Sequence, residues 1–213
     1  MNTKIKGQFV QYDANGLRIS ARCPSCLQQG ILDPINVPDV APQNTGTPVF
    51  GQRRCPNPNC MQHIFFVSDR STSECFPPER LDFDATDIPK PLVSSFTEAI
   101  ACHSVECYIA SALMIRRTLE ELCKDRGATG KNLKERLASL GTKVVLPTEL
   151  LEALDHLRLL GNDAAHIESQ EYDKVGKPEV EIAIEFTKEV LKAVYQYSGL
   201  LGKLKGLKKS PTP

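Results

Sequence analysis

The sequence predicts an α+β fold that is mainly α, in which a small β module precedes an antiparallel helical bundle. Eleven of the fifteen prolines lie between Pro24 and Pro91, where short β-type runs are bounded by Pro, Gly and Asn. After residue 91, apolar residues recur at the spacing of helix faces. A length of 213 residues suits one large domain or two small ones. We therefore expect a β module over residues 1–88, a helical bundle over 89–200 and a basic, disordered tail over 201–213.

Two runs in the first part have the composition of β-strands, residues 7–12 and residues 63–67. Residues 33–50, which lie between these runs, contain four prolines and few large apolar side chains. A stretch of that length and composition is typical of a long loop, and we expect part of it to be mobile.

The helical part begins at Pro89-Lys90-Pro91, because proline is favoured in the first turn of a helix. The expected helices, in chain order, cover residues 92–127, 133–140, 147–166 and 180–197. The first of them would be about 50 Å long if unbroken, so we expect a kink or break near residues 101–104. Gly199 and Gly202 should close the last helix. Four helices with short connections imply an antiparallel bundle.

The 26 basic and 26 acidic side chains give a net charge of zero, but the two signs are unevenly distributed. Residues 1–202 contain 22 basic and 26 acidic groups, a net charge of −4, whereas residues 203–213 contain four lysines and no acid. The body therefore has no broad basic surface for phosphates, and contact with a nucleic acid would depend on the tail or on Arg116 and Arg117.

The composition also excludes several classes of protein. With 41% apolar and 24% charged residues, the chain is neither fibrous nor wholly disordered. No apolar run approaches the ~20 residues that span a bilayer. The first six residues are not followed by the apolar stretch of a secretory signal. We therefore expect a cytoplasmic protein without a membrane partner.

Four of the eight cysteines have the spacing of a metal site. They form a C-x2-C pair and a C-x4-C pair separated by 28 residues: Cys23, Cys26, Cys55 and Cys60. Two such turns bring four sulfurs together, which is enough for tetrahedral zinc. A closed four-sulfur site leaves no position open for a substrate. We therefore expect a structural zinc ion that stabilises a segment with few apolar residues.

Other interpretations of these cysteines stay open. Disulfides are disfavoured in a reducing cytoplasm, and a redox-active C-x-x-C usually begins a helix in a βαβ unit, which this pattern lacks. An iron–sulfur cluster also takes four thiolates, and the sequence does not separate it from zinc. His63, three residues after Cys60, is an alternative ligand, although we expect it on the outgoing strand.

A polar stripe is expected on the third helix, where Arg158, Asn162 and His166 are spaced i, i+4 and i+8. Gly161 costs this helix about 1 kcal/mol relative to alanine, which indicates close approach of another helix or of a ligand. The alternative is plain helix termination, because Asn and Gly weaken helices and histidine is favoured at a helix C-terminus.

Two charged pairs are expected on the first helix at i, i+4 spacing, Arg116 with Glu120 and Arg117 with Glu121. Such pairs usually lie at the surface. Because Arg116 is next to the apolar Ile115, we expect one of the pairs to face the bundle interior. Its partner there would be Asn162 or His166.

Three motifs of the helical part together resemble the family called domain of unknown function 4145. In chain order they are Phe96-x-Glu98-Ala99, Arg116-Arg117-x-x-Glu120 and Gly161-Asn162-x-Ala164-Ala165-His166. The resemblance covers residues from about 90 to 198. The preceding cysteine pairs are similar to the zinc ribbon that often precedes this domain in bacterial members. The resemblance therefore implies a zinc-ribbon module followed by the family's helical bundle.

That family resembles a branch of the HEPN superfamily (higher eukaryotes and prokaryotes nucleotide-binding). Members of that superfamily are helical bundles, often dimeric, and are tied to RNA cleavage, toxin–antitoxin systems and phage defence. The resemblance implies a HEPN-like bundle, a homodimer formed through it and a role in defence. Active members carry an Arg, a polar residue, three further residues and a His. Asn162 and His166 match the last two positions, but Gly161 replaces the Arg that would stabilise a phosphorane.

These observations favour a non-catalytic binding or regulatory module that recognises a nucleic acid, a nucleotide or a protein partner. Its ligand-binding residues would be Arg116, Arg117, Glu120 and Arg158. One alternative is a metal-independent endoribonuclease in which His166 is the general acid or base and Asn162 orients the phosphate. The other alternative is a purely structural polar network without a ligand, formed by Arg116, Glu120, Asn162 and His166.

Overall fold

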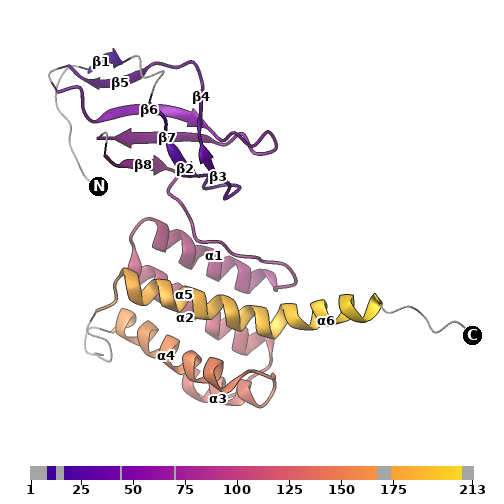
Figure 1. Cartoon of the computed structure of the whole chain (residues 1–213). Helices are drawn as coiled ribbons and strands as arrows, with labels where there is room; N and C mark the ends of the chain where they lie inside the picture. The colour runs from indigo at the N-terminus through magenta and orange to yellow at the C-terminus, as the bar shows by residue number, and fades with distance from the viewer. Residues whose placement is uncertain (1–8, 13–16, 44, 70, 167–173, 208–213) are drawn as a thin grey trace, which may run out of the picture. The chain divides into compact units, whose positions relative to one another are not determined.

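The computed structural model describes residues 9–12, 17–43, 45–69, 71–166 and 174–207, and its elements are labelled in Figure 1. Its strands are antiparallel and precede the helices, so the α+β, mainly α fold class is confirmed. The chain divides into two compact units, Met1–Arg80 and Leu81–Pro213.

The first unit is built around an antiparallel sheet in the order β1-β5-β6-β7-β8, with β4 also paired to β6, and a separate hairpin of β2 and β3. The strands are β1 (Phe9–Tyr12), β2 (Ser20–Arg22), β3 (Gln29–Ile31), β4 (Asp33–Pro34), β5 (Asp39–Pro42), β6 (Val49–Arg54), β7 (His63–Ser68) and β8 (Ser73–Phe76). Along β7, Ile64 and Phe66 are buried whereas His63 and Phe65 are exposed, as the two-residue period of a strand requires. The buried face contributes to a small core whose aliphatic members include Ile19, Leu32, Val49 and Ile64.

The prediction of a long loop over residues 33–50 is wrong, because β4, β5 and the start of β6 lie in this segment. β5 pairs with β1 on one side and with β6 on the other. Its first residue, Asp39, is buried and accepts two hydrogen bonds of 2.8 Å from the guanidinium of Arg53 on β6. This buried ion pair ties β5 into the sheet and offsets the low strand propensity of a proline-rich segment. The two predicted strands are present as β1 and β7.

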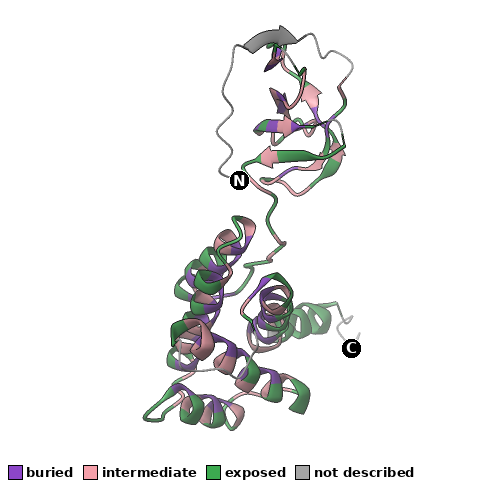
Figure 2. Ribbon diagram, turned by 90° about the vertical axis from the view of Figure 1, so that its left-hand side faces the viewer, coloured by how far each residue is buried: buried purple, intermediate pink, exposed green. Residues whose placement is uncertain are grey.

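The second unit is a bundle in which α2 packs against α1, α3, α4 and α5. The helices are α1 (Lys90–Ser104), α2 (Tyr108–Asp125), α3 (Leu133–Gly141), α4 (Thr148–Ala165), α5 (Lys177–Leu191), the π-helical η1 (Lys192–Gln196) and α6 (Tyr197–Gly206). Figure 2 shows their buried sides turned toward one another. Residues 81–88 join the same core, where the Phe83 ring meets Phe96 edge-on at a centroid distance of 4.7 Å. Within the described ranges, no helix combines the length and the apolar character that crossing a membrane requires.

The break predicted near residues 101–104 occurs at residues 105–107, between α1 and α2. There Glu106 has a positive φ of 62°. Its backbone N–H donates to the carbonyl of His103 at 3.0 Å, and that of Cys107 donates to the carbonyl of Cys102 at 2.9 Å. This pair of bonds is the Schellman pattern that ends a helix, so the long apolar repeat becomes two helices.

The last helix extends further than the sequence predicts. Gly199 and Gly202 do not close it, because η1 and α6 continue α5 as far as Gly206. A Cβ atom at Gly199 would lie only 2.9 Å from a carboxylate oxygen of Asp87, so this glycine permits close approach of the preceding loop instead. Residues 201–206 of the predicted disordered tail are therefore helical, whereas residues 208–213 lie outside the described residues.

Candidate functional site

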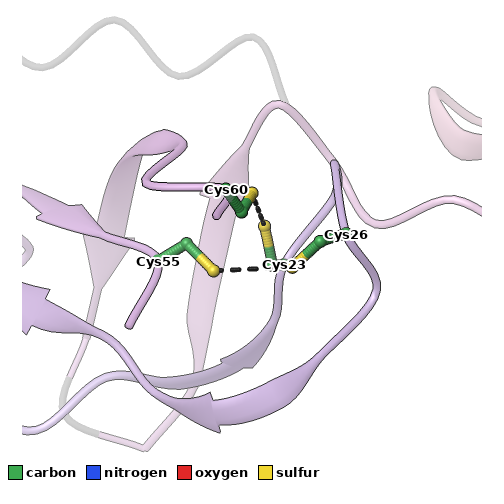
Figure 3. Close-up of side chains that lie close together, drawn as sticks. All are labelled: Cys23, Cys26, Cys55 and Cys60. Atoms are coloured by element: carbon green, nitrogen blue, oxygen red, sulfur yellow. Dashed lines mark hydrogen bonds between the residues drawn. The ribbon is translucent and has the colours of Figure 1, made fainter. Parts of the chain in front are cut away.

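The four cysteines with metal-site spacing converge at one point of the first unit (Figure 3). Their sulfur atoms all lie within 4.8 Å of one another. The Cys23 and Cys60 sulfurs are 3.7 Å apart, and those of Cys26 and Cys55 are 3.5 Å apart. A disulfide needs about 2.05 Å, whereas sulfurs around one tetrahedral ion at about 2.3 Å would be about 3.8 Å apart. The cluster is therefore compatible with a metal site, and all four thiols are free.

Two similar turns present these thiols. One connects β2 to β3 and the other connects β6 to β7. The residue after the second cysteine of each turn has a positive φ, 62° at Leu27 and 51° at Met61. The backbone N–H of the first cysteine, Cys23 or Cys55, donates across the turn at 3.0 or 2.9 Å. Each turn thus contributes one buried and one partly exposed thiol. His63 is exposed at the start of β7 and is not part of the cluster.

The thiols of the cluster differ in acidity. The backbone N–H of Gln28 donates to the Cys26 sulfur and lowers the pKa of this thiol to about 7. Burial raises the pKa of Cys55 to about 12. Because metal ligands must be thiolates, Cys26 is the thiol of this pair that is ionised most readily, and metal capture by the cluster would release protons.

In the second unit, the predicted close approach at Gly161 is a contact between α2 and α4. Arg116 of α2 lies directly over Gly161, where a Cβ atom would be 2.7 Å from the Arg116 Cβ. The Arg116 guanidinium donates a hydrogen bond to the side-chain oxygen of Asn162. Its Nε also lies 3.4 Å from a carboxylate oxygen of Glu120. One arginine thus joins the two helices at the position where the glycine leaves room for it.

Replacement of Gly161 by alanine tests this contact. We expect Gly161→Ala to lower the free energy of unfolding of the second unit by about 1–3 kcal/mol, because the added methyl overpacks the Arg116 stem. The gain of about 1 kcal/mol in helix propensity would be outweighed. Urea unfolding followed by helical circular dichroism measures the difference.

A second glycine provides the control. Gly202 of α6 has open space where its Cβ would lie, so Gly202→Ala should not destabilise the chain. Equal effects of the two substitutions would contradict the tight contact between α2 and α4.

The remaining candidate residues of the helical unit do not join the Arg116 contact. Arg117 is exposed and lines an open cavity of about 680 Å³ near the end of α2. Arg158 bonds Asp155 at 2.7 Å on its own helix, and this bond lowers the pKa of the Asp155 carboxyl. His166 follows the last residue of α4 and is exposed, and its side chain makes no hydrogen bond or ion pair with another described residue. The structure therefore brings together Arg116, Glu120 and Asn162 only.

A groove between α4 and α5 was not anticipated from the sequence. It has a volume of about 390 Å³, and its apolar floor includes Leu157, Leu160, Ile182 and Phe186. Ile182 and Phe186 are 59% and 40% exposed and are neighbours at i, i+4 spacing on α5, so they form a small apolar patch. Three glutamates lie among its lining residues, Glu149 and Glu152 on α4 and Glu179 on α5. The signal in the sequence is a second apolar stripe on α5, beside the stripe that faces the core.

The comparisons with known proteins identify one family. The family described as domain of unknown function (DUF4145) matches residues 97–210, which is more than half of the chain. The matched range runs from α1 through α6. No curated protein and no solved structure matches the chain.

Proposed function

The chain belongs to the DUF4145 family, and from that premise we propose a non-catalytic binding module that a structural zinc ion stabilises and that captures a protein partner. The description of the family names no activity, so the proposal rests on the geometry of each unit. The observation that carries it is the apolar groove with an acidic rim between α4 and α5.

Zinc is the metal that the four thiols suit best. Sulfur separations of 3.5 and 3.7 Å fit tetrahedral Zn–S bonds of about 2.3 Å. Four protein ligands fill every position of such an ion, which supports a structural role and not a catalytic one. The small core of the first unit includes Cys23 and Cys55 themselves, so the metal would add stability where apolar burial is limited.

The Arg116 contact supports a non-catalytic role for the helical unit. A metal-independent ribonuclease needs a cation that stabilises the developing charge on phosphorus beside its histidine. Arg116 is instead engaged by Asn162 and Glu120, and His166 is exposed outside this contact. The same contact favours the structural alternative for these three residues, because it fixes α2 against α4.

The groove supports a protein as the partner. Its apolar floor would bury leucine-like side chains, which is how an amphipathic helix is recognised. Its rim carries Glu149 and Glu152, which would attract lysines and repel the phosphates of a nucleic acid. The partner that fits is a helical segment with an apolar face bordered by basic residues.

Binding of a labelled helical peptide tests this function. The probe is a peptide of leucines at i, i+3, i+4 and i+7 with lysines elsewhere, measured by fluorescence anisotropy against the full, zinc-loaded chain. We expect Ile182→Glu to weaken its binding about tenfold or more, because the charge lies on the apolar floor. A matched peptide with glutamate in place of lysine should bind more weakly at low salt.

Two controls make the result decisive. Val145 is an apolar residue that is 99% exposed and does not line the groove, so Val145→Glu should leave binding unchanged. Mixed-sequence RNA should neither bind at the groove nor be cleaved. RNA cleavage that disappears in His166→Ala would establish the ribonuclease alternative instead, and absence of peptide binding would overturn the proposed function. The HEPN relationship, the role in defence and the cytoplasmic location stay predictions of the sequence.

A further inference from the structure

The last helix carries an apolar stripe that is exposed among the described residues of its unit. Five large side chains on and just after α6 are 49–80% exposed: Tyr197, Leu200, Leu201, Leu204 and Leu207. At 100° per residue they occupy an arc of about 120° on the helix. Lys203 and Lys205 lie on the two borders of this arc. Figure 2 shows this helix coloured as exposed, and its sequence is that of an amphipathic segment with basic edges.

The start of this region already contacts the loop that precedes α1. Gln196 donates to the backbone carbonyls of Asp84 and Thr86 at 2.9 and 3.1 Å, and Gly199 lies against Asp87. These contacts hold the start of α6 against the loop that precedes α1. The apolar stripe does not take part in these contacts and is exposed.

The groove between α4 and α5 has the chemistry that this stripe requires. Its exposed Ile182 and Phe186 offer apolar contacts. Glu149 and Glu152 on one side and Glu179 on the other match the lysines at the two borders of α6. Glu149 and Glu152 are exposed residues of α4 that line the groove, so they can meet basic side chains of a partner.

The α6 of the same chain does not reach this groove. α5, η1 and α6 form one uninterrupted helix, and Figure 1 shows α6 continuing beyond the ends of its neighbours. Leu204 lies 18 residues after Phe186, about 27 Å further along that helix. Only another molecule can bring such a stripe to the groove.

We infer that the groove between α4 and α5 receives α6 of a second copy of this chain. The inference rests on the proposed function, because it names an occupant of the same groove. If each copy inserts its α6 into the other, the two contacts are equivalent and a closed, two-fold symmetric dimer results. The apolar stripe of each copy then covers the groove floor of the other copy.

Sedimentation equilibrium of the full, zinc-loaded chain tests the inference. We expect a dimer of twice the 23.5 kDa chain mass that dissociates on dilution. The double substitution Leu200→Glu/Leu204→Glu should raise its dissociation constant about a hundredfold, because it places two charges in the centre of each contact. Val145→Glu, which adds the same charge outside the groove, should not change it.

A charge exchange shows whether α6 and the groove touch directly. Lys203→Glu/Lys205→Glu should weaken association about tenfold, and combination with Glu149→Lys/Glu152→Lys should restore it. Lys143→Glu, at an exposed lysine outside the groove, is the matched control. A monomer at every concentration would overturn the inference, and so would a dimer that ignores Leu200→Glu/Leu204→Glu.

The same variant separates this inference from the proposed function. The Leu200→Glu/Leu204→Glu chain keeps its own groove intact, so it should bind the leucine–lysine peptide at least as well as the unchanged chain. If the unchanged chain is monomeric and still binds that peptide through Ile182, the occupant is another protein. The inference then fails while the proposed function stands.

Discussion

Removal of the metal from the four-cysteine cluster is expected to unfold the first unit and to leave the helical unit folded. Structural zinc contributes about 10–16 kcal/mol in zinc-finger peptides, more than the small core of this unit can replace. Treatment with a chelator should collapse the dispersed amide NMR signals of β6 and β7, whereas the helical circular dichroism persists. Metal analysis of protein purified without added metal should give one zinc per chain.

Cysteine substitutions give the same test without a chelator. Cys55→Ser removes a ligand and should reproduce the chelated state. Cys75→Ser is the matched control, because Cys75 lies on β8 outside the cluster and should not alter metal content. A first unit that keeps its amide protection after complete metal loss would contradict a structural role. If metal analysis finds stoichiometric iron and no zinc, the site is an iron–sulfur cluster and not a zinc site.

Loss of the buried ion pair between β5 and β6 is also expected to destabilise the first unit strongly, although less than loss of the metal. In Asp39→Ala, the guanidinium of Arg53 remains buried at 4% exposure without its carboxylate. Breaking such a pair costs about 3–5 kcal/mol, because the remaining charge is uncompensated. Urea unfolding of the zinc-loaded chain, followed by the amide signals of β6 and β7, measures the loss.

Two further variants check the cause of that loss. Glu79 pairs with Arg22 at 3.4 Å and is 57% exposed, so Glu79→Ala should change the stability by less than about 1 kcal/mol. Replacing both members of the buried pair, as in Asp39→Ala/Arg53→Met, should recover much of the loss, since no unpaired charge then remains. A double variant as unstable as Asp39→Ala would assign the effect to packing instead.

The features that could be predicted from the sequence are those set by local spacing. Helical periodicity located α1 to α5, and the C-x2-C and C-x4-C turns identified the four thiols. Gly161 indicated a close approach because a glycine inside a helix has a cost that some contact must justify. The partner in that contact, Arg116, was among the candidates, although the sequence left His166 as an equal alternative to Asn162.

The features that escaped prediction depend on contacts between distant residues. β5 forms in a proline-rich segment because Asp39 pairs with Arg53, 14 residues later in the chain. No local sequence pattern predicts that pairing. α6 continues through Gly199, which lies close to Asp87, 112 residues earlier in the chain. The groove exists only because α4 and α5 lie side by side. In the sequence of α5, Ile182 and Phe186 are close to the residues that face the core, so the helical pattern did not distinguish the two stripes.

If α6 of one copy occupies the groove of another, as we infer, the exposed stripe of α6 would also control access to that groove. A groove that accepts α6 of another copy also accepts any competing helix of the same chemistry, so the two occupants are linked by mass action. In such a dimer, most grooves would be open to a foreign helix at low abundance, and most would be closed by the chain itself at high abundance. A rise in the cellular concentration of the protein would then inhibit binding of the foreign helix.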